Sequence, residues 1–219
     1  MKYDDIYTET EACPNTLSML GPIARLAGKW YGEDGVDTHP QADGPEMEPY
    51  HETWEFEILD PQNNGPQVLY GLRYHVAITK PGELMAFHDQ VGYLLYEPET
   101  GKLYQTLAIP RGQIAMAAGE VHELNPRRFT LRAERGNPVN GICSNPFLEE
   151  AFLTTSWEIT YEFHDDGTFS YEQVTKLVIP GVEGEFEHTD TNRLRLIQPA
   201  RPNPAMIQFG LIGHAVQED

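Results

Sequence analysis

Regular alternation of apolar and polar side chains over many short segments constrains this chain more than any other feature. The clearest case is Ser156–His164, in which every second residue is large and apolar: Trp157, Ile159, Tyr161 and Phe163. Successive side chains of a β-strand point to opposite faces of the sheet, so a period of two predicts a strand with one buried and one solvated face. Strands of this kind are typical of antiparallel sheets.

Turn-forming residues separate the alternating segments. Pro81-Gly82, Pro110-Arg111-Gly112 and Asp165-Asp166-Gly167 each stand between two of them, as expected of β-hairpins. The pattern predicts about ten strands, near residues 30–36, 53–59, 68–78, 84–96, 102–109, 113–121, 129–135, 152–164, 168–179 and 190–198.

Ten short antiparallel strands without intervening helices favour an all-β fold, an up-and-down β-barrel, because closure removes the exposed sheet edges. A barrel of this size is wide enough to hold a small ligand. A two-sheet sandwich fits the same pattern and stays open as an alternative.

We expect a single barrel domain over residues 16–198, between an irregular arm (1–15) and a tail (199–219). Residues 15–27 predict a short helical plug, which Pro22 divides into pieces. The stretches 37–50 and 136–147 are rich in proline and glycine and are expected to be loops.

The chain is strongly acidic. Its 219 residues contain 34 Asp and Glu but 15 Lys and Arg, a formal charge of −19, which argues against binding to nucleic acid or to an anionic membrane surface. The two cysteines, Cys13 and Cys143, are too few for a disulfide framework. We find neither a secretory signal nor an apolar run of the ~20 residues that cross a bilayer, so we expect a cytoplasmic protein.

Common catalytic motifs are missing from the sequence. The segment 28–32 lacks the hydroxyl residue and the helix of a phosphate-binding loop, and no Gly-x-Ser-x-Gly motif occurs. A cupin-type metal site needs closely spaced histidines on one strand pair, and neither His51-Glu52 nor His88-Asp89 supplies them.

Two of the eight histidines stand apart from the others. His188 precedes the last strand and shares its parity with Leu194 and Leu196, which predicts that it faces the interior. His88 lies in a mainly apolar strand near residues 86–93. A neutral imidazole in an apolar cavity can ligate iron. The pattern places the remaining candidates, His75, His122 and His164, at solvated or structural positions.

Two ordered motifs resemble the nitrobindin-like haem-binding β-barrels, relatives in shape of the fatty-acid-binding proteins and lipocalins. Residues 26–35 (LAGKWYGEDG) are similar to the family's opening Leu-x-Gly-x-Trp-x-Gly-x-Gly motif, with one residue added. Residues 88–94 (HDQVGYL) are similar to its His-x-Glx-x-Gly-Tyr motif. The hairpins at 103–119 and 157–174 also match, so the resemblance extends in patches over about residues 20–197.

The resemblance implies a ferric haem b with one protein ligand. His188 occupies the position of the family's axial histidine and is the predicted iron ligand, and His88 matches a histidine on the other side of the pocket. We expect Phe87 to contribute to the same cofactor site. Such a centre is suited to binding nitric oxide or to isomerising peroxynitrite to nitrate.

The sequence departs from the family pattern around His188. Residues 187–192 (EHTDTN) are polar, where the family has Pro-His-Leu followed by an apolar strand. Two other functions therefore stay open: a lipocalin-like carrier of a small apolar ligand without haem, and a scaffold whose barrel is filled by side chains. A homodimer is possible in each case.

Overall fold

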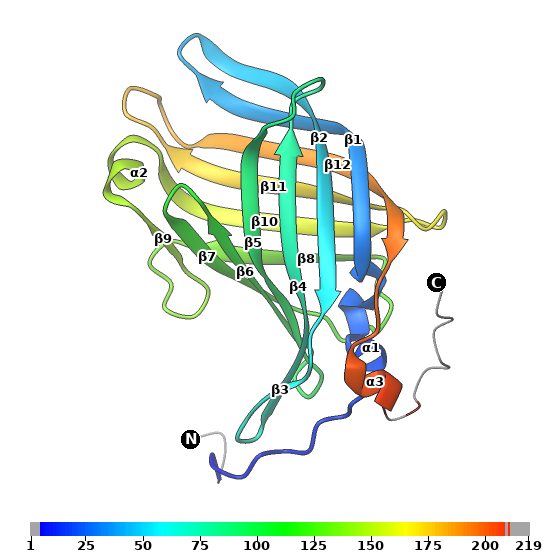
Figure 1. Cartoon of the computed structure of the whole chain (residues 1–219). Helices are drawn as coiled ribbons and strands as arrows, with labels where there is room; N and C mark the ends of the chain where they lie inside the picture. The colour runs from blue at the N-terminus through cyan, green and yellow to red at the C-terminus, as the bar shows by residue number, and fades with distance from the viewer. Residues whose placement is uncertain (1–4, 209, 211–219) are drawn as a thin grey trace.

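The computed structural model describes residues 5–208 and residue 210, which form a closed antiparallel barrel of ten strands (Figure 1). The barrel strands are β1 (Gly28–Gln41), β2 (Gly44–Ile58), β4 (Gln67–Thr79), β5 (Ala86–Glu97), β6 (Lys102–Ile109), β7 (Gln113–Glu120), β8 (Arg128–Glu134), β10 (Leu153–Phe163), β11 (Phe169–Val178) and β12 (Phe186–Pro199). Two short strands, β3 (Gln62–Asn64) and β9 (Ile142–Ser144), pair with β4 and β7.

The barrel closes in two places that join strands far apart in sequence. β1 pairs with β12, the last strand, and β2 pairs with β4 over eight residues, from His51↔Thr79 to Ile58↔Leu72. The ladder is therefore continuous around the ring. The all-β barrel and its ten predicted strands are confirmed, and the sandwich alternative is wrong.

The stretch 37–50, expected to be a loop, is instead the outer half of a long hairpin. β1 and β2 stay paired up to Gln41↔Gly44, beyond the last pairs with β12 and β4. In this two-stranded ribbon only one edge of each strand is paired. Proline lacks an N–H, and such a position tolerates it, as at the pair Pro40↔Pro45. The proline content was thus compatible with strands.

The second expected loop, 136–147, is also partly regular. It contains β9, which pairs with β7 through Ile114↔Cys143, and it leads into helix α2 (Pro146–Ala151). Asn145 caps this helix by accepting a hydrogen bond from the Leu148 N–H, and Pro146 occupies its first turn. Within this segment β9 extends the sheet alongside β7.

A helical plug covers one end of the barrel, as predicted. It consists of α1 (Thr16–Met19) and the 3₁₀-helix η1 (Gly21–Leu26). Leu20, Ile23 and Leu26 are fully buried in the barrel core. The short helix α3 (Pro204–Gln208) lies beside α1, where Asn203 Oδ1 accepts a hydrogen bond from the Thr16 hydroxyl at 3.0 Å.

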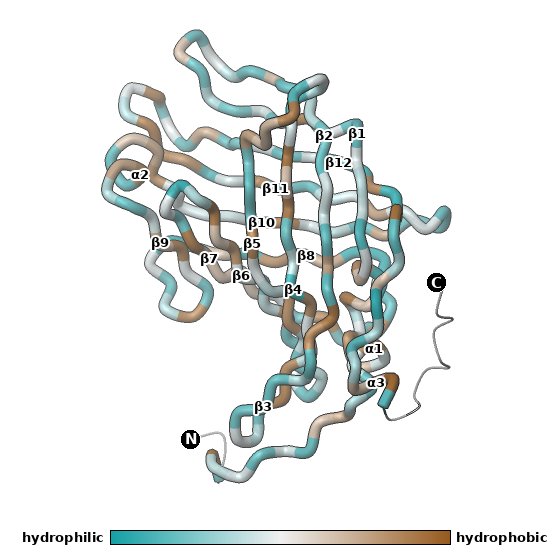
Figure 2. The backbone as a smooth tube through the Cα atoms, viewed as in Figure 1, coloured by the Kyte–Doolittle hydropathy of each residue, from teal (hydrophilic) through white to brown (hydrophobic). Residues whose placement is uncertain are grey.

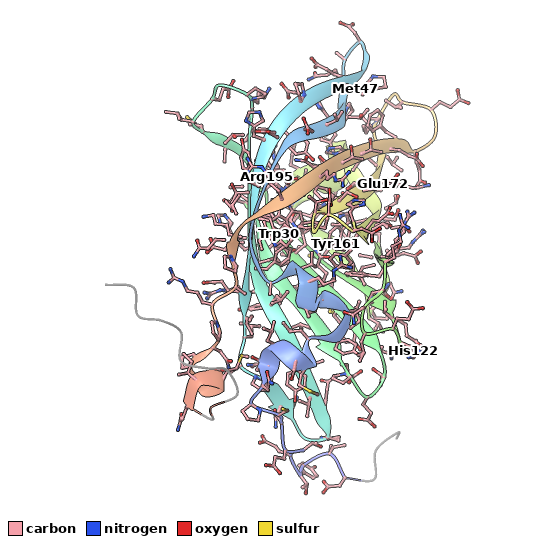
Figure 3. The ribbon with its side chains drawn as sticks, turned by 90° about the vertical axis from the view of Figure 1, so that its right-hand side faces the viewer. Trp30, Met47, His122, Tyr161, Glu172 and Arg195 are labelled. Carbon is pink, nitrogen blue, oxygen red and sulfur yellow. The ribbon has the colours of Figure 1, made fainter. Side chains whose placement is uncertain are left out.

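Aromatic side chains fill the half of the barrel interior that lies next to the plug. The Trp54 ring lies 5.3–6.4 Å, centroid to centroid, from five other rings: Phe56, Tyr74, Tyr161, Phe169 and Tyr171. Figure 3 shows Trp30 and Tyr161 in this dense centre, whereas Met47 lies on the protruding hairpin. Polar and apolar residues alternate along the strands in Figure 2, because one face of each strand packs on this core and the other meets solvent.

We predict that Phe169→Ala destabilises the barrel by about 3–5 kcal/mol. Phe169 is fully buried, and its ring packs edge-on against Trp30 at 4.9 Å, so truncation leaves a cavity within the aromatic core. Urea unfolding followed by tryptophan fluorescence measures the change. The control is Glu172→Gln, an exposed position on the same strand, which should stay within about 0.5 kcal/mol of the wild type. A Phe169→Ala loss as small as the control would contradict this account of the core.

Candidate functional site

The interior changes character at the end of the barrel opposite the plug, which we call the open end. It is formed by the last residues of β1 and β4 and the first residues of β5 and β12. Here charged and imidazole side chains lie beside the fully buried ring of Tyr50. These polar side chains keep some contact with solvent: Asp37 10%, Asp190 13%, His39 20% and His188 30% exposed.

His188 lies on the interior face of β12, on the same side as the buried Asn192 and Leu194. Its Nε2 donates a hydrogen bond to Asp37 Oδ1 at 2.7 Å and lies 3.8 Å from Asp190 Oδ2. Burial alone lowers the pKa of His188, but the hydrogen bond to Asp37 and the charge of Asp190 outweigh it and raise the pKa above its usual value.

Four side chains form one connected group, the Asp–His cluster: Asp37, His39, His188 and Asp190. Asp37 bridges two histidines, since its Oδ2 lies 3.1 Å from His39 Nδ1 while its Oδ1 contacts His188. Asp190 accepts a hydrogen bond from Gln173 Nε2 at 2.9 Å. Burial is the main cause that raises the pKa of Asp190, and the neighbouring charge of Asp37 acts in the same direction.

His88 faces this cluster from another wall. It shares the interior face of β5 with the buried Gln90 and Leu94, and its Nε2 donates to Gln90 Oε1 at 3.3 Å. Strands β1, β2 and β4 separate β5 from β12 in the sheet. The charge of His88 nevertheless lowers the pKa of Asp190, so the two side chains interact through the barrel interior.

Phe87, the third residue predicted for the site, is not brought to it. It has the opposite parity to His88, its side chain is 38% exposed, and its ring lies 5.8 Å from the Lys80 ammonium. His75, His122 and His164 lie at the solvated or structural positions that the pattern predicted. His75 pairs with Asp89 on the outer surface, His122 is exposed beside Glu120, and His164 contacts Ser170.

A fully buried carboxyl lies between the cluster and the aromatic core. Oε2 of Glu52 accepts hydrogen bonds from Trp54 Nε1 at 2.6 Å and from the Tyr171 hydroxyl at 3.0 Å. Burial raises the pKa of Glu52 to about 8, so the group is largely protonated at neutral pH. Asn192 lies beside the carboxyl and favours its ionised form, although its Nδ2 and Glu52 Oε1 both lack a hydrogen-bond partner of good geometry.

Sequence reasoning overlooked most of these polar groups. Asp37 fell inside the expected loop 37–50, so no strand parity was assigned to it. Glu52 and Asp190 were detectable, because Glu52 has the parity of Trp54, and Asp190 that of His188. In both cases a charged residue at an interior position was the available signal.

A separate apolar groove lies on the outside of the barrel, over β5, β6 and β7. It has a volume of about 770 Å³ and runs beneath residues 137–143. Its lining includes Val91, Tyr93, Ile114, Met116 and Val139. None of the residues predicted for the cofactor site lines it.

We predict that the free energy of unfolding falls less with rising pH in Glu52→Gln than in the wild type. The pKa of Glu52 rises from 4.5 to about 8 on folding, so its favourable contribution is complete below about 4.5 and is lost as the pH approaches about 8. As the pH rises over this range, the free energy of unfolding of Glu52→Gln minus that of the wild type should increase by at most about 1.4 kcal/mol per pH unit.

Urea unfolding at a series of pH values between 5 and 8 tests this prediction. The matched control is Glu55→Gln, an outward-facing carboxylate on the same strand, for which the difference from the wild type should stay constant with pH. A Glu52→Gln difference that does not change with pH would show that Glu52 titrates at an ordinary pKa.

Within residues 5–208 and 210, no helix is long and apolar enough to cross a membrane.

Comparison with known proteins identifies the family to which the chain belongs. A model of the THAP4-like, heme-binding beta-barrel domain matches residues 19–195, most of the chain and all of the barrel except the last residues of β12. A search of curated proteins finds no match. The matched region contains the 3₁₀-helix η1 of the plug, the Asp–His cluster, His88 and Glu52. The chain thus belongs to the family of THAP4-like, haem-binding β-barrel domains.

Proposed function

We propose that this chain binds ferric haem b at the open end of the barrel, with His188 as the axial ligand. The observation that carries the proposal is the interior-facing, partly exposed imidazole of His188 on the last strand of a barrel from a haem-binding family. Histidine is a common axial ligand of haem iron, and its neutral form offers a nitrogen lone pair.

Binding of haem iron at His188 requires one rearrangement. Nε2 of His188 is engaged by Asp37 Oδ1 at 2.7 Å, so iron binding at this atom requires the carboxylate to withdraw. Asp37 has a second partner available, since its other oxygen already lies 3.1 Å from His39 Nδ1. The carboxylate can therefore release His188 and stay paired, and loss of this contact also favours the neutral imidazole that binds iron.

The remaining polar groups act on a ligand held at this place. His88 and Gln90, which are hydrogen-bonded to each other, present donors from the opposite wall. Glu52 holds a proton near neutral pH within the same interior. A bound ferric haem would supply an iron that binds nitric oxide and isomerises peroxynitrite to nitrate, and we propose this activity for the loaded protein.

Hemin titration followed by absorption spectroscopy tests the haem site. We expect stoichiometric uptake with a Soret band in the wild type, and loss or a marked shift of that band in His188→Ala. The matched control is His75→Ala, an exposed histidine that also pairs with an aspartate, which should bind hemin like the wild type. A Soret band that survives His188→Ala unchanged would refute the assignment of the axial ligand.

The proposed activity is tested on the hemin-loaded protein by stopped-flow decay of peroxynitrite, with nitrate yield as the second readout. We expect faster decay and a higher nitrate yield with the loaded protein than with the same amount of apoprotein. His88→Ala should change the rate while keeping the Soret band, because His88 lies on the interior face of β5, separated from β12 by three strands. Equal decay with loaded protein and apoprotein would contradict the activity and leave haem binding intact.

The outer groove favours a second candidate function, the carriage of a small apolar ligand. Its volume of about 770 Å³ and its aliphatic lining are typical of pockets that hold such molecules. Displacement of a fluorescent fatty-acid analogue, compared between the wild type and Ile114→Asp, tests this alternative. Binding that the substitution abolishes would support it, and failure of the wild type to bind the analogue would contradict it.

A further inference from the structure

The Asp–His cluster has the composition and spacing of a metal site independent of haem. One ligand atom each from Asp37, His188 and Asp190 lies within 4.8 Å of the other two. Asp37 comes from β1 and the other two from β12, and the pair Asp37↔Asp190 in the β1–β12 ladder holds them side by side. A ladder between two barrel strands is a rigid support for such a constellation.

The cluster contains two carboxyl groups and no lysine or arginine. Among the ion pairs of the described residues, Asp37 and Asp190 pair with histidines, and neither pairs with a lysine or an arginine. Both carboxylates are mostly removed from solvent, with 10% and 13% of their side chains exposed. Two nearly buried carboxylates without a lysine or arginine partner favour the binding of a cation.

A second observation comes from the groups around the cluster. Nδ1 of His39 is buried and lacks a hydrogen bond of good geometry, although it lies 3.1 Å from Asp37 Oδ2. On the other side, Gln173 Nε2 donates to Asp190 Oδ2. A neighbour that donates to a ligating carboxylate, as Gln173 does, is typical of the surroundings of metal sites.

We propose that Asp37, His188 and Asp190 bind a divalent transition-metal ion, with His39 and Gln173 orienting the two carboxylates. An imidazole combined with carboxylates suits zinc, manganese, cobalt or ferrous iron better than calcium or magnesium, which prefer oxygen ligands alone. Three protein ligands leave coordination positions open, and the partial exposure of His188 gives water or a small molecule access to them.

This inference goes beyond the proposed function and does not rest on it. Iron of haem and a free divalent ion would both use His188 Nε2, so the two occupants exclude each other. Asp37 has opposite effects on them. It ligates the divalent ion, whereas it competes with haem iron for Nε2. Asp37→Asn should therefore weaken binding of the divalent ion without weakening hemin binding.

The test is titration of the chelator-treated full chain with zinc, manganese and cobalt chlorides by calorimetry, with the visible spectrum of bound cobalt as an independent readout. We expect one ion per chain, and Asp37→Asn, Asp190→Asn and His188→Ala should each weaken binding at least about tenfold. The matched control is Asp89→Asn, because Asp89 contacts His75 Nε2 at 2.8 Å on the exposed outer face and should bind like the wild type.

Two further measurements keep the proposal falsifiable if a variant folds poorly. Far-ultraviolet circular dichroism shows whether each variant is folded. A second measurement needs no variant: zinc should raise the Tm of the wild type, and a chelator should reverse the rise. Saturating zinc should also block formation of the Soret band. Failure of all three metals to bind the wild type, or binding that Asp37→Asn and Asp190→Asn leave unchanged, would overturn the metal site. Neither result bears on hemin uptake by the metal-free protein, so the two proposals fail separately.

Discussion

Closure of the sheet by the pairing of β2 with β4 and of β1 with β12 is the constraint on which the rest of this structure depends. Once the ladder is continuous, every strand has an interior and an exterior face, and parity alone decides which side chains meet inside. Asp37 on β1 and His188 on β12 are 151 residues apart in the chain, yet closure places them within hydrogen-bonding distance.

The interior enclosed in this way has two halves with different physical roles. Near the plug, the rings around Trp54 pack at 5.3–6.4 Å and account for much of the buried apolar surface. At the open end the same strands carry aspartate, histidine and glutamine. Burial of the aromatic half stabilises the fold. This stabilisation allows the other half to hold polar groups that contribute little to the free energy of unfolding.

Glu52 lies at the boundary between these halves and shows how the packing of one changes the chemistry of the other. Its carboxyl is fully buried because Trp54 and Tyr171 surround it, and burial raises its pKa to about 8. The two hydrogen bonds from these rings favour the ionised form but do not outweigh the desolvation. A proton held near neutral pH is thereby placed beside the Asp–His cluster.

The sequence by itself determined the strand pattern, the helical plug and the interior side of His188, because these follow from local periodicity and turn chemistry. It favoured a closed barrel but fitted a two-sheet sandwich as well, and the pairing of β2 with β4 decided between them. It did not reveal the course of 37–50, since prolines are tolerated in a ribbon with a free edge, and so the interior position of Asp37 was hidden. Only the tertiary structure decided that Asp37, His39, His188 and Asp190 form one group and that His88 faces it. The reason is physical: parity tells which face a side chain occupies, but the register between β1 and β12 and the closure of the ring set the distances between residues of different strands.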